Sequence, residues 1–191
     1  MGLDIFTITD NYAQLYSVNN YDDYNNRRKY HSLSRTFCNF ICRRNVTSHE
    51  PELEQIGTIT NIDITPIYEM ENYPSKESLY WDLEGAEDEN EKSEILKQAE
   101  ESKKKYQGNI DKISNTIDEL IHKLNSINNL PELLVATDFD TLNNEEYFAD
   151  FGIDKGDGYI NNNFGQDLRN FQRFLEFSKA KSARTVWFTY G

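Results

Sequence analysis

A ladder of mostly apolar residues between positions 96 and 127 constrains the fold of this 191-residue chain more than any other feature. Its members alternate at spacings of three and four residues: Leu96, Ala99, Lys103, Tyr106, Ile110, Ile113, Ile117, Leu120, Leu124 and Ile127. This period of 3.5 residues keeps one narrow stripe on one side of a helix, as in a coiled coil. A single helix over residues 90–128 would be about 55 Å long.

Two residues argue against one unbroken helix. Lys103 places a charge in the stripe, and Gly108 weakens its middle by about 1 kcal/mol relative to alanine. A helical hairpin or a break near Gly108 is therefore kept as the alternative. If the helix is unbroken, we expect part of the stripe to be left for another chain, by self-association through the 96–127 helix or by partner binding. Ile113 and Ile117 would then be contacts.

The remaining pattern predicts an α+β fold. Alternating residues predict strands near both termini, over 3–9 and 184–190, and a run of β-branched residues predicts the strongest strand over 56–68. Helices are expected at these positions: 27–44, 75–83 with Ser75 as N-cap, and from Asn163 or Gln166 to about 181.

These elements suggest a small sheet holding the N- and C-terminal strands, packed by helices, with a long helix or helical hairpin projecting. We expect residues 1–74 and 131–191 to form one α+β domain together. Residues 75–130 would then be a helical, coiled-coil-like insertion in that domain.

The chain is strongly acidic, with a formal net charge of −13. Such a surface repels nucleic acid and anionic membranes and attracts basic partners, although solubility alone is an equally simple explanation. The densest acidic segment is our candidate for contact with a basic protein partner. It has seven carboxylates against one lysine: Asp82, Glu84, Glu87, Asp88, Glu89, Glu91 and Glu94.

A cationic group stands out in this acidic chain. Arg27, His31 and Arg35 are one turn apart on the helix expected over 27–44. They are candidates for binding a phosphate or an acidic segment, and the alternative is neutralisation by surrounding carboxylates. No signal peptide or membrane span is expected, and the two cysteines do not suggest a disulfide or a zinc site, so we expect a cytoplasmic protein without a cofactor.

One short motif suggests a different activity. Asp138-Phe139-Asp140-Thr141-Leu142 resembles the first motif of haloacid-dehalogenase-type phosphatases, in which the first aspartate attacks phosphate beside a magnesium ion. The threonine here follows the second aspartate directly, one residue earlier than in that family. The resemblance implies a metal-dependent, phosphate-acting enzyme with Asp138 and Asp140 in the site. The alternative is a solvated loop or a helix cap.

The two ends of the chain carry a second resemblance. The opening Met1-Gly2-Leu3-Asp4-Ile5 and the closing Val186-Trp187-Phe188 are similar to those of short phage and prophage proteins of bacteria. The resemblance implies a mobile-element origin and attaches no activity. Our leading hypothesis is a non-enzymatic acidic interaction protein, such as an inhibitor that occupies the basic surface of a nuclease or another nucleic-acid-handling protein of a host defence system. The phosphate-acting enzyme is the alternative.

Overall fold

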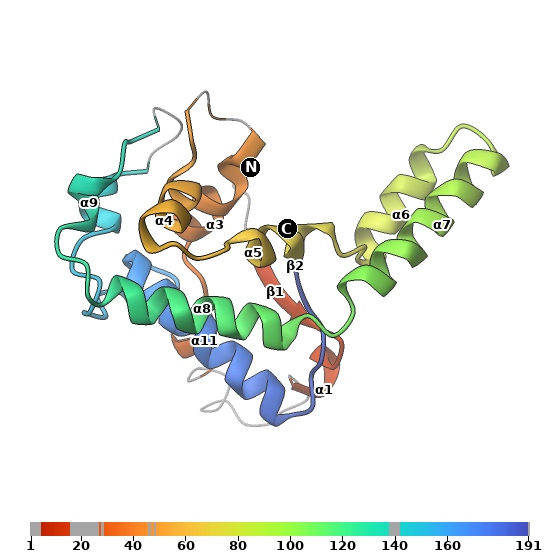
Figure 1. Cartoon of the computed structure of the whole chain (residues 1–191). Helices are drawn as coiled ribbons and strands as arrows, with labels where there is room; N and C mark the ends of the chain where they lie inside the picture. The colour runs from red at the N-terminus through yellow and green to blue at the C-terminus, as the bar shows by residue number, and fades with distance from the viewer. Residues whose placement is uncertain are drawn as a thin grey trace.

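The computed structural model describes residues 5–15, 27, 29–45, 47, 49–137 and 142–190. Helices surround the core, and one antiparallel sheet of two strands joins the segments near the two ends of the chain (Figure 1). The described elements are β1 (Ile5–Thr9), α1 (Tyr12–Leu15), α3 (Arg35–Ile41), η1 (Cys42–Asn45), α4 (Glu52–Thr60), α5 (Thr65–Glu69), η2 (Met70–Asn72), α6 (Lys76–Gly85), α7 (Glu89–Tyr106), α8 (Ile110–Leu124), α9 (Leu130–Leu133), α10 (Asn144–Tyr147), α11 (Phe164–Ala180) and β2 (Val186–Tyr190).

The sheet confirms the predicted pairing of the terminal strands. Ile5 is paired with Tyr190 and Thr9 with Val186. Val186 and Phe188 are buried, and the ring of Phe188 lies 5.9 Å from that of Phe171 in α11. The predicted α+β fold, with a small sheet packed by helices, is therefore confirmed.

The ladder breaks at Gly108, as one of the two alternatives required. Gly108 has a φ of 77°, a left-handed conformation that glycine adopts without strain. The break is held against β2, because the Gly108 N–H donates to Thr185 Oγ1 at 3.1 Å and the Asn109 side chain bonds both backbone groups of Val186 at 2.8 and 2.9 Å. Two helices, α7 and α8, therefore replace one long helix.

The C-terminal half of the ladder forms part of the core. Ile113 and Ile117 in α8 are 1% and 0% exposed. Helix α8 packs against α11, α5 and α4, so the stripe is covered by the chain itself. The prediction that Ile113 and Ile117 contact another chain is therefore wrong, because their side chains are inaccessible in the folded monomer.

The strand predicted over 56–68 is also wrong, and this error explains the previous one. Residues in this region form helices α4 and α5, which supply the cover that α8 was thought to lack. Leu53, Ile56 and Thr60 are spaced three and four residues apart and are all buried, so one helical face packs on the core. This packing outweighs the β preference of the branched side chains.

The helix predicted over 27–44 is interrupted. Residues 32–34 are not helical, and α3 begins only at Arg35. Ser34 is its N-cap, and the serine hydroxyl accepts a hydrogen bond from the Phe37 N–H at 3.1 Å. Serine is a common helix N-cap, but the apolar residues at helical spacing on both sides of Ser34 predicted one continuous helix.

Helices α6 and α7 pack on each other as a hairpin that projects from the rest of the molecule (Figure 1). Ser75 caps α6 as predicted, accepting a hydrogen bond from the Ser78 N–H at 3.0 Å. No residue of α6 is buried, and in α7 only Ala99 and Tyr106 are. The hairpin thus contributes little to the core. Within the described ranges, we find no helix that combines the length and the apolar character needed to span a membrane.

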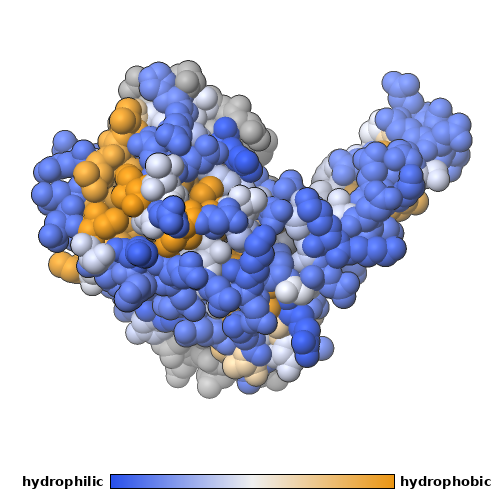
Figure 2. Space-filling view, in the orientation of Figure 1, coloured by the Kyte–Doolittle hydropathy of each residue, from blue (hydrophilic) through white to orange (hydrophobic). Residues whose placement is uncertain are grey.

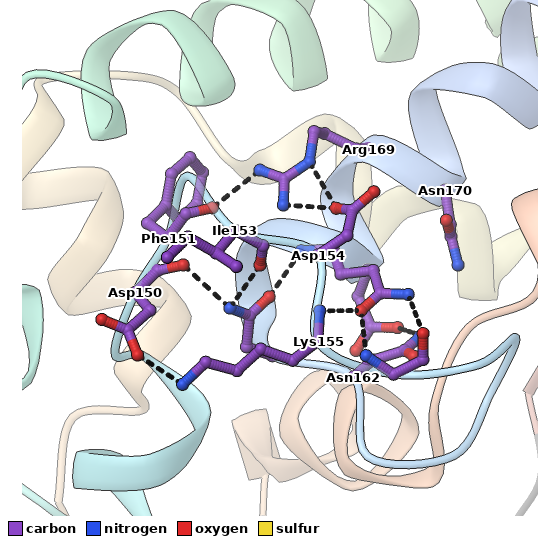
Figure 3. Close-up of polar contacts among 12 residues, drawn as sticks. Asp150, Phe151, Ile153, Asp154, Lys155, Asn162, Arg169 and Asn170 are labelled. Carbon is purple, nitrogen blue, oxygen red and sulfur yellow. Dashed lines mark hydrogen bonds and ion pairs between the residues drawn. The ribbon is translucent and has the colours of Figure 1, made fainter.

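The segment 149–163 folds over the start of α11 (Figure 3). Asn163, one of the two predicted starts of this helix, is its N-cap: its side-chain oxygen accepts a hydrogen bond from the Gln166 N–H, and its side-chain amide donates to the carbonyls of Asp150 and Ile153, both at 2.9 Å. Arg169 donates to the Phe151 carbonyl at 2.7 Å and forms an ion pair with Asp154 at 2.5 Å. These contacts fix the segment that leads to residues 159–161.

Candidate functional site

The tip of the α6–α7 hairpin carries the acidic segment identified in the sequence. All seven candidate carboxylates are exposed: Asp82, Glu84, Glu87, Asp88, Glu89, Glu91 and Glu94. They come from the end of α6, the connecting turn and the first turns of α7. Hydrophilic residues cover most of the hairpin surface seen in Figure 2. The structure therefore brings all seven together at one end of a projecting arm.

Four of the seven have local structural roles. Asp88 is the N-cap of α7 and accepts hydrogen bonds from the N–H groups of Asn90 and Glu91 at 2.8 and 2.9 Å. Glu91 in turn accepts from the Glu87 N–H at 2.7 Å, so the two carboxylates fix the turn between the helices. The other two are in ion pairs: Glu89 with Lys92 at 2.9 Å and Glu94 with Lys97 at 3.8 Å.

The other three carboxylates, those of Asp82, Glu84 and Glu87, form no ion pair within the described ranges. The pKa of Lys92 is raised above its ordinary value, mainly by its hydrogen bond to Glu89 and also by the negative charges of Glu89 and Glu84. Because these three side chains do not hold the hairpin together, their charges can be changed without removing its caps.

An exposed aromatic pair beside these carboxylates was not identified from the sequence. Trp81 is 66% exposed and Tyr80 is 56% exposed, with ring centroids 5.3 Å apart. In the sequence, Leu79, Trp81 and Leu83 together give the helix predicted over 75–83 its apolar character. The i,i+4 pair Leu79 and Leu83 is partly buried, and a residue midway between them in sequence must point the other way.

The three candidate cationic residues also lie together, although not on one helix. Arg27, His31 and Arg35 all line one cleft beside β1 and α3. The Arg27 guanidinium lies over the Phe177 ring, 4.9 Å from its centroid, and the His31 ring is 5.2 Å from that of Phe177. Each of the three cationic side chains also interacts with another residue of the chain.

Asp138 and Asp140 lie outside the described residues, so the phosphatase-like motif stays a prediction. Among the residues that the structure does describe, no three histidine, cysteine, aspartate or glutamate side chains are grouped as metal ligands.

An apolar patch lies near α4 and α9 (Figure 2), where Ile59, Leu133 and Val135 are exposed.

A buried polar cluster around Asp167 was also missed by the sequence reasoning. The Asp167 carboxylate is fully buried and accepts hydrogen bonds from four donors: the Ser34 N–H at 2.9 Å, the Ser34 hydroxyl at 2.5 Å, the Tyr147 hydroxyl at 2.9 Å and the Asn162 amide at 2.8 Å. One carboxylate thus joins α3, α10, α11 and the 149–163 segment. Burial raises the pKa of Asp167 to about 6, although its hydrogen bonds act in the opposite direction.

This pKa predicts a pH dependence of stability. The pKa of Asp167 in the folded protein is above its ordinary value of 3.8, so the folded state holds this proton more tightly than the unfolded state. Its contribution to the free energy of unfolding should be complete below pH about 4 and should be lost as the pH rises through about 6, a difference of about 3 kcal/mol. The measurement is urea unfolding of the wild type and of Asp167→Asn between pH 4 and 8. The stability of the wild type relative to the variant should fall with rising pH, and a constant or rising difference would contradict the prediction.

Comparison of the chain with protein-family models, with curated proteins and with solved structures finds no match.

Proposed function

We propose that this protein is a non-enzymatic binder that occupies a basic surface of a nucleic-acid-handling protein with the tip of its α6–α7 hairpin. The observation that carries the proposal is the exposed Trp81 beside seven exposed carboxylates on an arm that adds little to the core. The specific form that we propose is an inhibitor of a bacterial nuclease of a host defence system.

The chemistry of the tip supports a basic protein as the partner. Glu77 and Glu84 lie one helical turn before and after Trp81, so carboxylates flank the indole on its own face. An arginine or lysine side chain can lie over an indole face and pair with a carboxylate at the same time. Tryptophan is also among the residues that most often dominate interface energies.

The shape of the hairpin supports an enzyme groove as its target. A projecting helical pair can enter a concave surface that the rest of the molecule cannot reach. Basic grooves that follow a nucleic-acid backbone present a series of positive charges, and a protein with a net charge of −13 is attracted to them over a distance. Binding by this route would compete directly with nucleic acid.

A triple variant tests the proposal without removing the caps of the hairpin. Asp82→Asn, Glu84→Gln and Glu87→Gln together remove three tip charges, and we expect them to abolish the retention of basic nucleic-acid-binding proteins from a bacterial lysate at about 0.15 M salt. Bound proteins are identified by mass spectrometry and are expected to be released by double-stranded DNA. Trp81→Ala should weaken retention of the same proteins with less dependence on salt.

The matched control also removes three exposed carboxylates, but away from the tip: Glu101→Gln, Glu119→Gln and Glu176→Gln. This control should retain the same proteins as the wild type. If both triple variants lost retention equally, net charge alone would explain the loss, and a binding site at the tip would be contradicted. Retention that persists at about 1 M salt, where the Debye length is about 3 Å, would contradict the electrostatic account.

A further inference from the structure

Two short linkers join the α6–α7 hairpin to the rest of the chain. Residues 73–75 connect η2 to α6, and residues 107–109 connect α7 to α8. The first linker is attached to β2 by aromatic stacking, because the Tyr73 ring lies on the Trp187 ring with the two centroids 4.4 Å apart. The base of the projecting hairpin is therefore in contact with the strand that closes the sheet.

The second linker is attached to the same stretch of chain by hydrogen bonds. The Gly108 N–H donates to Thr185 Oγ1 at 3.1 Å. The Asn109 side-chain amide donates to the Val186 carbonyl at 2.8 Å, and its oxygen accepts from the Val186 N–H at 2.9 Å. One side chain thus pairs with both backbone groups of a strand residue, as an adjacent antiparallel strand does. Because Thr185, Val186 and Trp187 are consecutive, both linkers are attached at one place.

An ion pair adds a weaker attachment at the base. The Glu69 carboxylate lies 4.0 Å from the Lys105 ammonium in α7 and 3.2 Å from the Lys112 ammonium in α8. Both lysines are more than half exposed, so solvent screens these pairs. In α6 and α7, which the structure describes in full, only Ala99 and Tyr106 are buried. The direction of the hairpin therefore depends on contacts at its base and not on packing along its length.

The length of α7 makes the position of the tip sensitive to this base. Its 18 residues span about 27 Å, so a rotation of about 20° at the base would move the far end by about 9 Å. We infer that β2 fixes the direction in which the hairpin projects, and that Asn109 is the residue that positions it. The consequence for binding rests on the proposed function: a tip held in one direction loses less conformational entropy when it meets a partner.

Residual dipolar couplings of backbone N–H groups, measured by NMR in a weakly aligning medium, test the inference without any partner. In the wild type, the couplings of α6 and α7 and those of α8 and α11 should fit one common alignment tensor. Asn109→Ala removes both hydrogen bonds to Val186, so its hairpin should need a separate tensor of smaller magnitude. The matched control, Asn115→Ala, removes the same amide from an exposed position of α8 and should keep the common tensor.

Thr185→Val is the second variant, because valine keeps the branched shape of threonine and removes only the hydroxyl that accepts from Gly108. Its hairpin should also leave the common tensor, by a smaller amount than in Asn109→Ala. Two tensors in the wild type, or one common tensor in every folded variant, would overturn the inference.

Retention of basic proteins from a lysate is the separate test of the consequence for binding. Asn109→Ala should weaken this retention several-fold although every tip residue is unchanged. Retention equal to that of the wild type, with a hairpin that has left the common tensor, would overturn the link between direction and binding. If the wild type itself retained no protein, the proposed function would fail, and the couplings would still decide whether β2 fixes the hairpin.

Discussion

Ile117→Glu is expected to unfold the isolated protein. The Ile117 side chain is 0% exposed at the centre of α8, a helix that packs against α11, α5 and α4. A carboxylate at this position would lose its hydration without a charge partner, and such substitutions cost more than about 4 kcal/mol. Since folded domains are stable by only about 5–15 kcal/mol, the cooperative thermal transition measured by circular dichroism should be lost.

The control for this substitution is Asn115→Glu, which adds the same side chain to an exposed position of the same helix. Its unfolding transition should match that of the wild type. If Ile117→Glu melted cooperatively at the wild-type temperature and changed only the association state in gel filtration, α8 would face another chain and its packing in the core would be contradicted.

Gly165→Ala is expected to destabilise the fold although it lies in a helix. A Cβ atom on Gly165 would be 1.9 Å from the Phe151 carbonyl oxygen, which is backbone and already accepts a hydrogen bond from Arg169. The 149–163 segment would have to move away from α11, at a cost of about 3 kcal/mol. In an open helical position the same substitution would stabilise by up to about 1 kcal/mol, so the sign itself is the test.

Differential scanning calorimetry should show a decrease of roughly 6–12 °C in the melting temperature of Gly165→Ala. Gly152→Ala is the local control, because a Cβ atom on Gly152 would meet no atom within 4 Å. That variant should melt with the wild type. Equal melting temperatures for all three proteins would show that the contact between Gly165 and Phe151 is not close in solution.

The sequence was sufficient where a local pattern and the tertiary contacts agree. Apolar and polar residues alternate in the segments near the two termini, and these segments form the two paired strands. Ser75 and Asn163 are the N-caps of α6 and α11, and both helices were predicted. The break at Gly108 was one of two alternatives, and local residues alone could not decide it. It depends on the hydrogen bonds of Gly108 to Thr185 and of Asn109 to Val186, which join residues far apart in sequence at the start of β2.

Prediction failed where distant packing overrode a local preference. The β-branched residues after Ile56 form helices because their buried face covers α8. For the candidate sites, the acidic tip was predicted from a run of carboxylates. Arg27, His31 and Arg35 were correctly predicted to lie together, but the single helix expected to carry them is interrupted at residues 32–34. Asp167 carried no signal, because its four donors come from residues that only the folded chain brings together.

The pairing of β1 with β2 also determines the order in which the molecule can be completed during synthesis. Residues of β1 leave the ribosome before their hydrogen-bonding partners, which are translated about 180 residues later, many seconds afterwards. During this interval the backbone edge of β1 has no strand beside it, and helices such as α4, α5 and α8 can already pack. The sheet can therefore close only after these helices have been translated, when β2 becomes available to pair with β1.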